Sequence, residues 1–171
     1  MKLDITNQER ELFEVIHTAA DSLHQDVYVV GGFVRDRILG IPCKDLDFVT
    51  VGDGPALAEE VSRRVGAAAS DLSVFKTFGT AMIRYKDLEL EFVGARKESY
   101  NTDSRKPEVE AGTLEDDQLR RDFTINALAA KLQGDGIYTI IDPFNGLDDL
   151  RDGLIITPLD PHQTFSDDPL R

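Results

Sequence analysis

The sequence predicts an α/β fold in which helices pack against a β-sheet. Short segments rich in β-branched and aromatic residues, such as 27–30, 46–51 and 88–93, are typical of strands, and they alternate with segments whose apolar residues recur at helical spacing. The 171 residues are 41% hydrophobic and 30% charged. This length and balance are typical of one well-packed globular domain.

The first third of the chain contains clear start and stop signals. Residues 6–9 (Thr-Asn-Gln-Glu) form a capping box, and the apolar residues that follow predict a helix to about His24. Val27–Val30 is a short buried strand that ends at Gly31-Gly32. Phe33–Leu39 is predicted to be a helix, which ends there because Gly40 and Pro42 follow.

The central part of the chain predicts further strands around one helix. Leu46–Val51 is predicted as a second strand, and Pro55–Val65 as a helix with proline in its first turn. Gly79–Tyr85 and Leu88–Val93 are expected to pair antiparallel around a turn at Lys86-Asp87.

The last part of the chain mixes a loop, helical segments and a short strand. Tyr100–Gly112 has few apolar residues and is expected to be a mobile loop. Leu114–Leu132 is predicted to be helical with a break near Asp122. Ile137–Ile141 is a short predicted strand, which a turn follows.

Charge and cysteine content restrict the functional classes. The net charge is −13, whereas a domain that grips RNA over its whole surface is expected to be basic. Either the substrate is not a nucleic acid, or most of the RNA-binding surface lies elsewhere. Cys43 is the only cysteine, which excludes a disulfide framework. With no membrane-length apolar segment and no signal-peptide pattern, we expect a cytoplasmic protein that does not bind membranes.

Gly31-Gly32 lies between a predicted strand and a predicted helix, which is a layout that can bind phosphate. Glycines let the backbone approach an anion, and the free amides of a helix start point toward it. Arg35 lies one turn further on with Asp36 beside it, and a guanidinium suits phosphate geometry. The alternative is a simple tight turn that surface charges follow.

Two acidic segments predict a metal site. Asp45 and Asp47 are two residues apart on a predicted strand, so both point to one face and Leu46 to the core. Glu89 and Glu91 likewise share one face of a later strand. If these strands are neighbours, one glutamate completes a set of three carboxylates, which favours Mg²⁺ or Mn²⁺. The alternative for each segment is a solvated strand surface.

Arg120-Arg121-Asp122 interrupts the acidic trend and is followed by Asn126. Arginine can bind phosphate, and aspartate or asparagine can bind ribose hydroxyls. The alternative is a helix stabilised by salt bridges between these arginines and the acidic residues before them.

Taken in order, these segments resemble the class II tRNA nucleotidyltransferase and bacterial poly(A) polymerase family. Each fragment is common, whereas the ordered set is specific, and the resemblance covers roughly 27–171. The matching residues are Gly31-Gly32-Phe33-Val34-Arg35-Asp36, Asp45-Leu46-Asp47, Phe78-Gly79-Thr80, Glu91 with Ala95-Arg96, and Leu114-Glu115-Asp116-Asp117 before Arg120-Arg121-Asp122-Phe123-Thr124-Ile125-Asn126-Ala127.

The resemblance implies a fold and a site. The fold is the DNA polymerase beta-like head, a mixed, mostly antiparallel sheet of about five strands with flanking helices. Asp45, Asp47 and Glu91 are the implied catalytic carboxylates, with Asp45 and Asp47 holding two Mg²⁺ or Mn²⁺ ions. The implied residues for binding ATP or CTP are Gly31, Gly32, Arg35, Asp36, Arg121, Asp122 and Asn126.

The resemblance also implies a longer protein in which different domains carry catalysis and base selection. Residues 1–160 correspond to the catalytic head, and 161–171 to the start of a junction with a helical neck that selects the base. The implied activity is transfer of CMP or AMP to an RNA 3′-hydroxyl, most simply at a tRNA CCA end. Poly(A) synthesis, partial CC or A addition, and a non-catalytic nucleotide-binding module remain alternatives. The 171 residues alone are expected to be nearly inactive.

Overall fold

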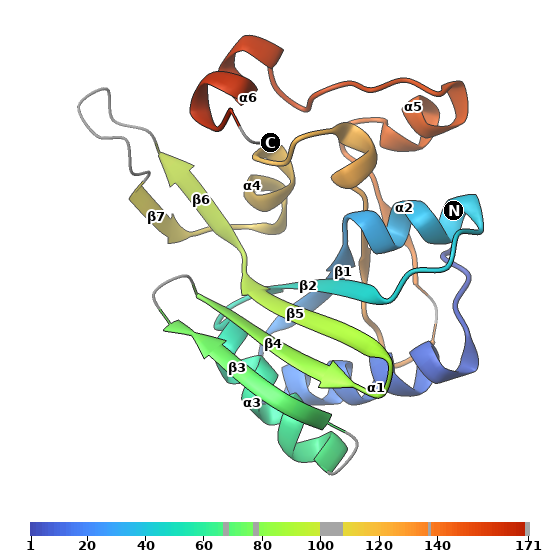
Figure 1. Cartoon of the computed structure of the whole chain (residues 1–171), viewed down its shortest axis with the longest axis vertical. Coiled ribbons are helices and arrows are strands. Elements are labelled where there is room, and N and C mark those ends of the chain that lie inside the picture. The colour runs from blue at the N-terminus through green and yellow to red at the C-terminus, as the bar shows by residue number, and fades with distance from the viewer. Residues whose placement is uncertain (67–68, 77–78, 100–107, 137, 170–171) are drawn as a thin grey trace.

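The computed structural model describes residues 1–66, 69–76, 79–99, 108–136 and 138–169, and its centre is one seven-stranded sheet (Figure 1). The strand order is β3-β4-β5-β2-β1-β8-β9. All neighbours pair antiparallel except β2 and β5, which are parallel. The strands are β1 Asp26–Val30, β2 Asp45–Val51, β3 Ala69–Phe75, β4 Thr80–Tyr85, β5 Leu88–Gly94, β8 Ala129–Lys131 and β9 Ile140–Ile141.

A separate two-stranded ribbon and six described α-helices complete the fold. The ribbon pairs β6 (Arg96–Ser99) with β7 (Glu108–Ala111). Figure 1 shows α1 and α3 on one side of the sheet and α4, α5 and α6 on the other. The helices are α1 Asn7–Ser22, α2 Gly32–Leu39, α3 Gly54–Val65, α4 Leu114–Leu119, α5 Gly146–Asp152 and α6 Pro161–Asp167, with a 3₁₀ turn at Thr124–Asn126. None of the described helices is long and apolar enough to span a membrane.

Aromatic side chains fill the main core between the sheet and α1. Phe13 makes edge-to-face contacts with Phe33, Phe48 and Tyr138, at ring-centroid distances of 5.8, 5.8 and 5.3 Å. Phe48 on β2 stacks on Phe92 on β5 at 5.1 Å. Such pairs add about 0.5–1.5 kcal/mol each beyond the burial of their area. This packing holds the two parallel strands together on the side away from their acidic residues.

Several sequence predictions are confirmed. The Thr6 capping box forms in both directions, with the Thr6 amide donating to Glu9 Oε2 at 2.7 Å and the Glu9 amide donating to Thr6 Oγ1 at 3.2 Å. The two central segments pair antiparallel as β4 and β5. The mixed, mostly antiparallel sheet with flanking helices is also found, although it has seven strands and not about five.

The predicted helix over 114–132 is wrong in its second half. The helix ends at Leu119, a 3₁₀ turn follows, and β8 then pairs with β1 and β9. Residues 127–130 are all buried. An apolar run that is buried on both faces has no periodicity that separates a strand from a helix, so pairing with β1 decided the outcome.

The expected mobile loop over 100–112 is wrong at its C-terminal end, because β7 pairs with β6 there. Residues 100–107 lie outside the described part of the chain. Residue 137 lies outside it too, and the strand predicted over 137–141 is limited to β9.

A buried ion pair fixes α2 against α1. The Arg37 guanidinium donates to Glu9 Oε1, and the Glu9 side chain is only 4% exposed. Arg37 also lies over the Phe33 ring, 5.4 Å from its centroid. Glu9 therefore serves both as a helix cap and as the counter-ion of the helix that carries Arg35.

Glu9→Gln tests this ion pair, because glutamine keeps the capping interaction and loses the charge. We expect a loss of roughly 1–3 kcal/mol in the free energy of unfolding, since Arg37 stays partly buried without its counter-ion. Urea unfolding measures it. Glu11→Gln, at an exposed position of the same helix, is the matched control and should stay within about 0.5 kcal/mol of wild type. Equal midpoints for the two variants would contradict the role of the pair.

Candidate active site

The predicted carboxylates lie on one face of the sheet. In the parallel register of β2 and β5, Asp45 lies opposite Glu89 and Asp47 opposite Glu91. Leu46, between the two aspartates, is fully buried on the other face. Because paired residues in a sheet point to the same side, Asp47 and Glu91 are direct neighbours across the strands. The sequence prediction that the two acidic strands are adjacent is therefore confirmed.

Burial and mutual repulsion both act on these carboxylates. Burial raises the pKa of Asp47, and the charges of Asp45 and Asp117 raise this pKa further, while Arg121 opposes the shift. Burial also raises the pKa of Glu91, with Asp47 as the second cause, against the lowering effects of Arg96 and Arg121. Burial, which disfavours the ionised form, is thus the main reason that both pKa values are raised.

Gly31 brings the backbone of the helix start next to these carboxylates. Its φ is +71°, a left-handed conformation that favours glycine. A Cβ at this position would lie 3.7 Å from Asp47 Oδ2 and 2.9 Å from Arg121 Nη1. Three predicted site residues therefore lie together: Gly31 of the phosphate turn, the metal ligand Asp47 and the nucleotide-binding Arg121.

The N-terminus of α2 is free of any capping side chain. Its N-cap residue is Gly31, and among the described residues no side chain accepts a hydrogen bond from the amides of its first turn. Each other described α-helix has a side-chain acceptor there: Thr6, Asp53, Thr113 and Asp160 cap α1, α3, α4 and α6, and Asp142 accepts from the first amides of α5. Uncapped amides at a helix start are suited to an anion.

A hydrogen-bond network joins α2 to the segment after α4. Arg35 Nη1 donates to Asn126 Oδ1, and Asn126 Nδ2 donates to both carboxylate oxygens of Asp122 at 3.0 and 3.2 Å. Arg35 Nε also donates to Asp36 Oδ1 at 2.8 Å. Four of the predicted nucleotide-binding residues, which lie up to 91 positions apart in the chain, are thus held together.

Asp117 is a site residue that the sequence reasoning did not single out. Its side chain is fully buried and accepts hydrogen bonds from both Arg120 and Arg121; Arg121 Nε and Nη2 lie 3.3 and 3.1 Å from Asp117 Oδ2. Arg121 Nη1 also donates to the Asn126 carbonyl at 3.4 Å. The spacing of three and four residues from Asp117 to Arg120 and Arg121 could have predicted these ion pairs. Because Asp117 is buried, the pairs hold the two arginine side chains in position.

Glu89, the other acidic residue on the outer face of β5, makes a different contact. It is exposed and forms an ion pair with Arg84 at 3.0 Å. That Glu91, and not Glu89, is the third carboxylate stays a prediction. Phe78 of the matching segment 78–80 lies outside the described residues.

The chemistry of the donor set fits a hard divalent cation. Carboxylate oxygens are the ligands that Mg²⁺ and Mn²⁺ prefer, and Asp47 and Glu91 lie side by side in the register of β2 and β5. Among the residues described, no three His, Cys, Asp or Glu side chains are arranged so that they could already hold a metal ion.

Comparison with known proteins places this chain in a family. Residues 27–156 match the model of the poly(A) polymerase head domain. The A-adding tRNA nucleotidyltransferase of Aquifex aeolicus (strain VF5) is 44% identical over 144 residues, which cover 84% of this chain and 17% of that protein. The A-adding tRNA nucleotidyltransferase of Halalkalibacterium halodurans is 35% identical over 171 residues, covering 100% of this chain and 39% of that protein.

Solved structures agree with the sequence relatives. A crystal structure of a tRNA nucleotidyltransferase with a primer tRNA and an incoming ATP analogue superposes with a TM-score of 0.76 at 37% identity. The match covers 91% of this chain and 41% of that one, so this chain spans less than half the length of each of these proteins. The matched residues include the Gly31 turn, the acidic strands and the arginine segment, and the chain belongs to the poly(A) polymerase head-domain family.

Proposed function

We propose that this chain is the catalytic head of a template-independent RNA nucleotidyltransferase. It transfers AMP or CMP from ATP or CTP to an RNA 3′-hydroxyl, at the 3′ end of tRNA. The observation that carries this proposal is the parallel register of β2 and β5, which sets Asp47 beside Glu91 and next to the uncapped start of α2. Nucleotidyl transfer requires a phosphate-binding site next to a set of metal-binding carboxylates.

The net charge of −13 supports a division of labour within a longer protein. An acidic domain is a poor general RNA binder, so most of the contact with tRNA belongs to segments that the longer relatives carry and this chain does not. The relatives that resemble this chain are named for tRNA end addition. We place the reaction in the cytoplasm.

In the proposed mechanism, the start of α2 and Arg35 hold the triphosphate, and Arg121 neutralises charge on it. Asn126 and Asp122 hold the Arg35 side chain and offer polar atoms to the ribose. Asp45, Asp47 and Glu91 would hold two Mg²⁺ ions; the chemistry that such ions would supply when bound is to make the attacking hydroxyl more acidic and to stabilise the leaving pyrophosphate. The 3′-oxygen bonds to the α-phosphorus as the α–β phosphate bond breaks.

Two alternatives are separated by experiment, one within the same activity class and one outside it. Poly(A) synthesis or partial CC or A addition would use the same carboxylates, and sequencing the products that the complete natural protein makes from tRNA lacking its CCA end separates them. A non-catalytic nucleotide-binding module would bind ATP tightly without metal and transfer nothing.

Asp47→Asn is expected to reduce transfer roughly 10³-fold or more, because metal-held charge contributes several kcal/mol to the transition state. The measurement is incorporation of labelled nucleotide into tRNA lacking its CCA end, with Mg²⁺, CTP and ATP. The matched control is Glu89→Gln on the same face, which should retain near wild-type transfer. Equal activity of wild type and Asp45→Asn/Asp47→Asn would contradict the proposal.

Asp47→Asn, which is expected to lose activity, is not expected to lose stability. A raised pKa means that the ionised form of Asp47 is disfavoured in the folded state, so the metal-free protein gains stability as pH falls from neutral through that pKa. Asp47→Asn removes this cost and should be at least as stable as wild type without metal. Mg²⁺ should raise the melting temperature of wild type and not of Asp45→Asn/Asp47→Asn. A similar rise in both proteins would argue against a site at these residues.

Arg35→Lys is expected to raise KM for ATP about tenfold or more, because lysine keeps the charge but cannot bond both phosphate and Asn126. Steady-state kinetics at saturating RNA measure this change. Arg151→Lys, at an exposed position on α5, should leave KM unchanged. If Arg35→Lys matches that control, then Arg35 does not contact the triphosphate.

We also expect the 171-residue chain alone to transfer nucleotides only weakly and to discriminate poorly between CTP and ATP. The comparison is incorporation per molecule of this chain and of the complete natural protein. Efficient and ordered CCA synthesis by the chain alone would show that base selection lies within it.

A further inference from the structure

The 3₁₀ turn Thr124–Asn126 lies between α2 and α5 and contacts both helices. On the α2 side, the Asn126 side chain accepts a hydrogen bond from Arg35. On the other side, Thr124 is only 2% exposed and contacts α5 through its side chain. The turn therefore links Arg35, which holds the triphosphate in the proposed mechanism, to a helix that has no role in that mechanism.

Residues 146–156 contact Thr124 at three points. The Thr124 hydroxyl donates to Asp149 Oδ2 at 2.6 Å, and the Thr124 amide donates to the Ile156 carbonyl at 2.8 Å. Gly146 lies directly against the Thr124 carbonyl, since a Cβ on Gly146 would come within 2.3 Å of that oxygen. Only a glycine permits such a close backbone approach. The side chain and the backbone of Thr124 are thus both fixed by α5 and by the residues that follow it.

α5 is itself anchored in the domain. Asp142 accepts hydrogen bonds from the Gly146 and Leu147 amides at 2.8 and 3.0 Å. Leu147 packs against the main hydrophobic core, and the Asp149 carbonyl accepts from the Leu154 amide at 2.8 Å. A helix of seven residues is not stable by itself. These contacts therefore determine where the Asp149 carboxylate lies.

The contact with Thr124 distinguishes Asp149 from the other acidic residues of α5. Asp149 is half-buried, and a hydrogen bond from a hydroxyl to a carboxylate is stronger than one between neutral groups. The Asp148 and Asp152 side chains are 63% and 53% exposed, and both form ion pairs with Arg151 at the surface. Asp149 is thus directed to the 3₁₀ turn, whereas its acidic neighbours are directed to solvent.

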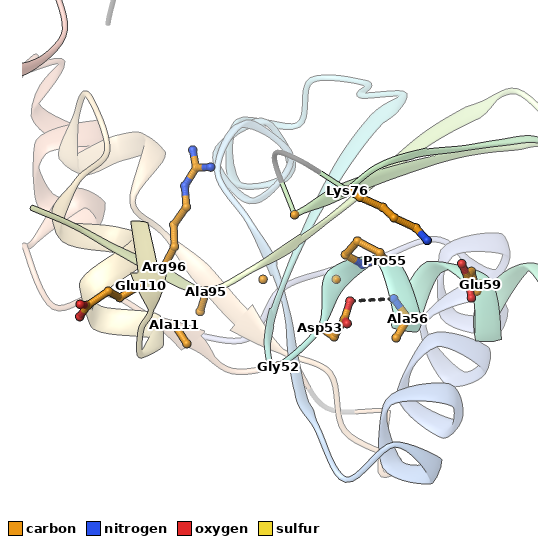
Figure 2. A pocket seen from close by; sticks show the side chains of 13 residues that line it. Gly52, Asp53, Pro55, Ala56, Glu59, Lys76, Ala95, Arg96, Glu110 and Ala111 are labelled. Carbon is orange, nitrogen blue, oxygen red and sulfur yellow. Dashed lines mark hydrogen bonds between the residues drawn. The ribbon is translucent and has the colours of Figure 1, made fainter. Parts of the chain in front are cut away.

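A cavity at the C-terminal ends of β2 and β5 takes no part in this support. Its lining residues come from the ends of these strands, the start of α3, the residues between β3 and β4, and the ribbon. Figure 2 shows Glu59 of α3 and Arg96 at the start of β6 beside this cavity. No described lining residue belongs to α2, the 3₁₀ turn or α5, so the route from Asp149 to Arg35 runs through the turn.

We propose that Asp149 is a positioning residue for binding of the nucleoside triphosphate. Through the Thr124 hydroxyl it fixes the 3₁₀ turn, and the turn holds the Asn126 side chain against Arg35. This inference rests on the proposed function, in which Arg35 holds the triphosphate. A guanidinium that is oriented before substrate binds loses less conformational entropy on binding. Loosening the turn therefore weakens ATP binding, while the carboxylates of β2 and β5 stay in place.

The test is steady-state kinetics with the complete natural protein and tRNA lacking its terminal nucleotides. Thr124→Val keeps the branched shape of the side chain but removes the hydroxyl. It should raise KM for ATP roughly fivefold or more, because the hydrogen bond to a carboxylate is lost. The value of kcat and KM for RNA should stay within about twofold of wild type. Thr124→Ser keeps the hydroxyl and should restore KM for ATP to within about twofold of wild type.

Two alanine variants of α5 provide a second comparison. Asp149→Ala should also raise KM for ATP roughly fivefold or more, since it removes the acceptor of the same hydrogen bond. Asp148→Ala removes an exposed carboxylate from the same helix and should leave KM for ATP unchanged. Circular dichroism shows which variants are folded at the assay temperature. If Thr124→Val is not folded, the comparison of Asp149→Ala with Asp148→Ala decides the test.

A double-mutant cycle separates positioning from a general loss of stability. Arg35→Lys already breaks the link between Asn126 and the phosphate. Adding Thr124→Val to Arg35→Lys should therefore raise KM for ATP by less than about twofold further. Titration calorimetry with ATP and Mg²⁺ in the absence of RNA should show the same pattern in Kd, and this measurement does not depend on turnover.

The outcomes are distinguishable. Absence of transfer by the wild-type protein defeats the proposed function, and calorimetry still tests the role of Asp149 in ATP binding. Normal wild-type transfer with an unchanged KM for ATP in Asp149→Ala overturns this inference alone, even if that variant is less stable. Equal effects of Thr124→Val in the wild-type and Arg35→Lys backgrounds also overturn it, because the contact would then not act through Arg35.

Discussion

The parallel pairing of β2 with β5 is the constraint on which the site depends. It is the only parallel contact in a described sheet that is otherwise antiparallel. The pairing sets Asp47 beside Glu91 on the outer face, and it stacks Phe48 on Phe92 on the inner face. Packing of the inner aromatic pair offsets the repulsion of the outer acidic pair, because both pairs are fixed by one register.

Positive charge around this acidic pair is held in place and does not neutralise it. Arg121 lies close enough to lower the pKa of Asp47, yet the net shift of that pKa is upward. The guanidinium is instead bonded to Asp117 and to a backbone carbonyl. Arg35 is likewise bonded to neighbouring polar side chains. These contacts fix the arginines around the site before any substrate binds, which lowers the cost of ordering them on binding.

The two faces of the sheet therefore have different tasks. The inner face, covered by α1 and α3, contains most of the hydrophobic core and supplies stability. The outer face contains the acidic pair, which lies next to the uncapped start of α2. Raised carboxylate pKa values are a local cost in stability, as is common at sites that must bind charge. The buried contact between Glu9 and Arg37 connects the two regions, because it joins α1 to the helix that carries Arg35.

The sequence alone determined the features that depend on near neighbours. The capping box at Thr6, the shared face of Asp45 and Asp47, the β4–β5 hairpin and the glycine turn all follow from spacing and residue type. The family resemblance rested on the order of such local segments. These predictions succeeded because the relevant interactions span only a few residues.

Only the tertiary structure decided the features that depend on long-range pairing. Residues 129–131 form β8 because β1 and β9 pair with them. Their apolar pattern alone does not distinguish a buried strand from a buried helix. The contact of Arg35 with Asn126 spans 91 positions. Complete burial of Asp117 follows from how the layers pack, which spacing along the chain does not encode.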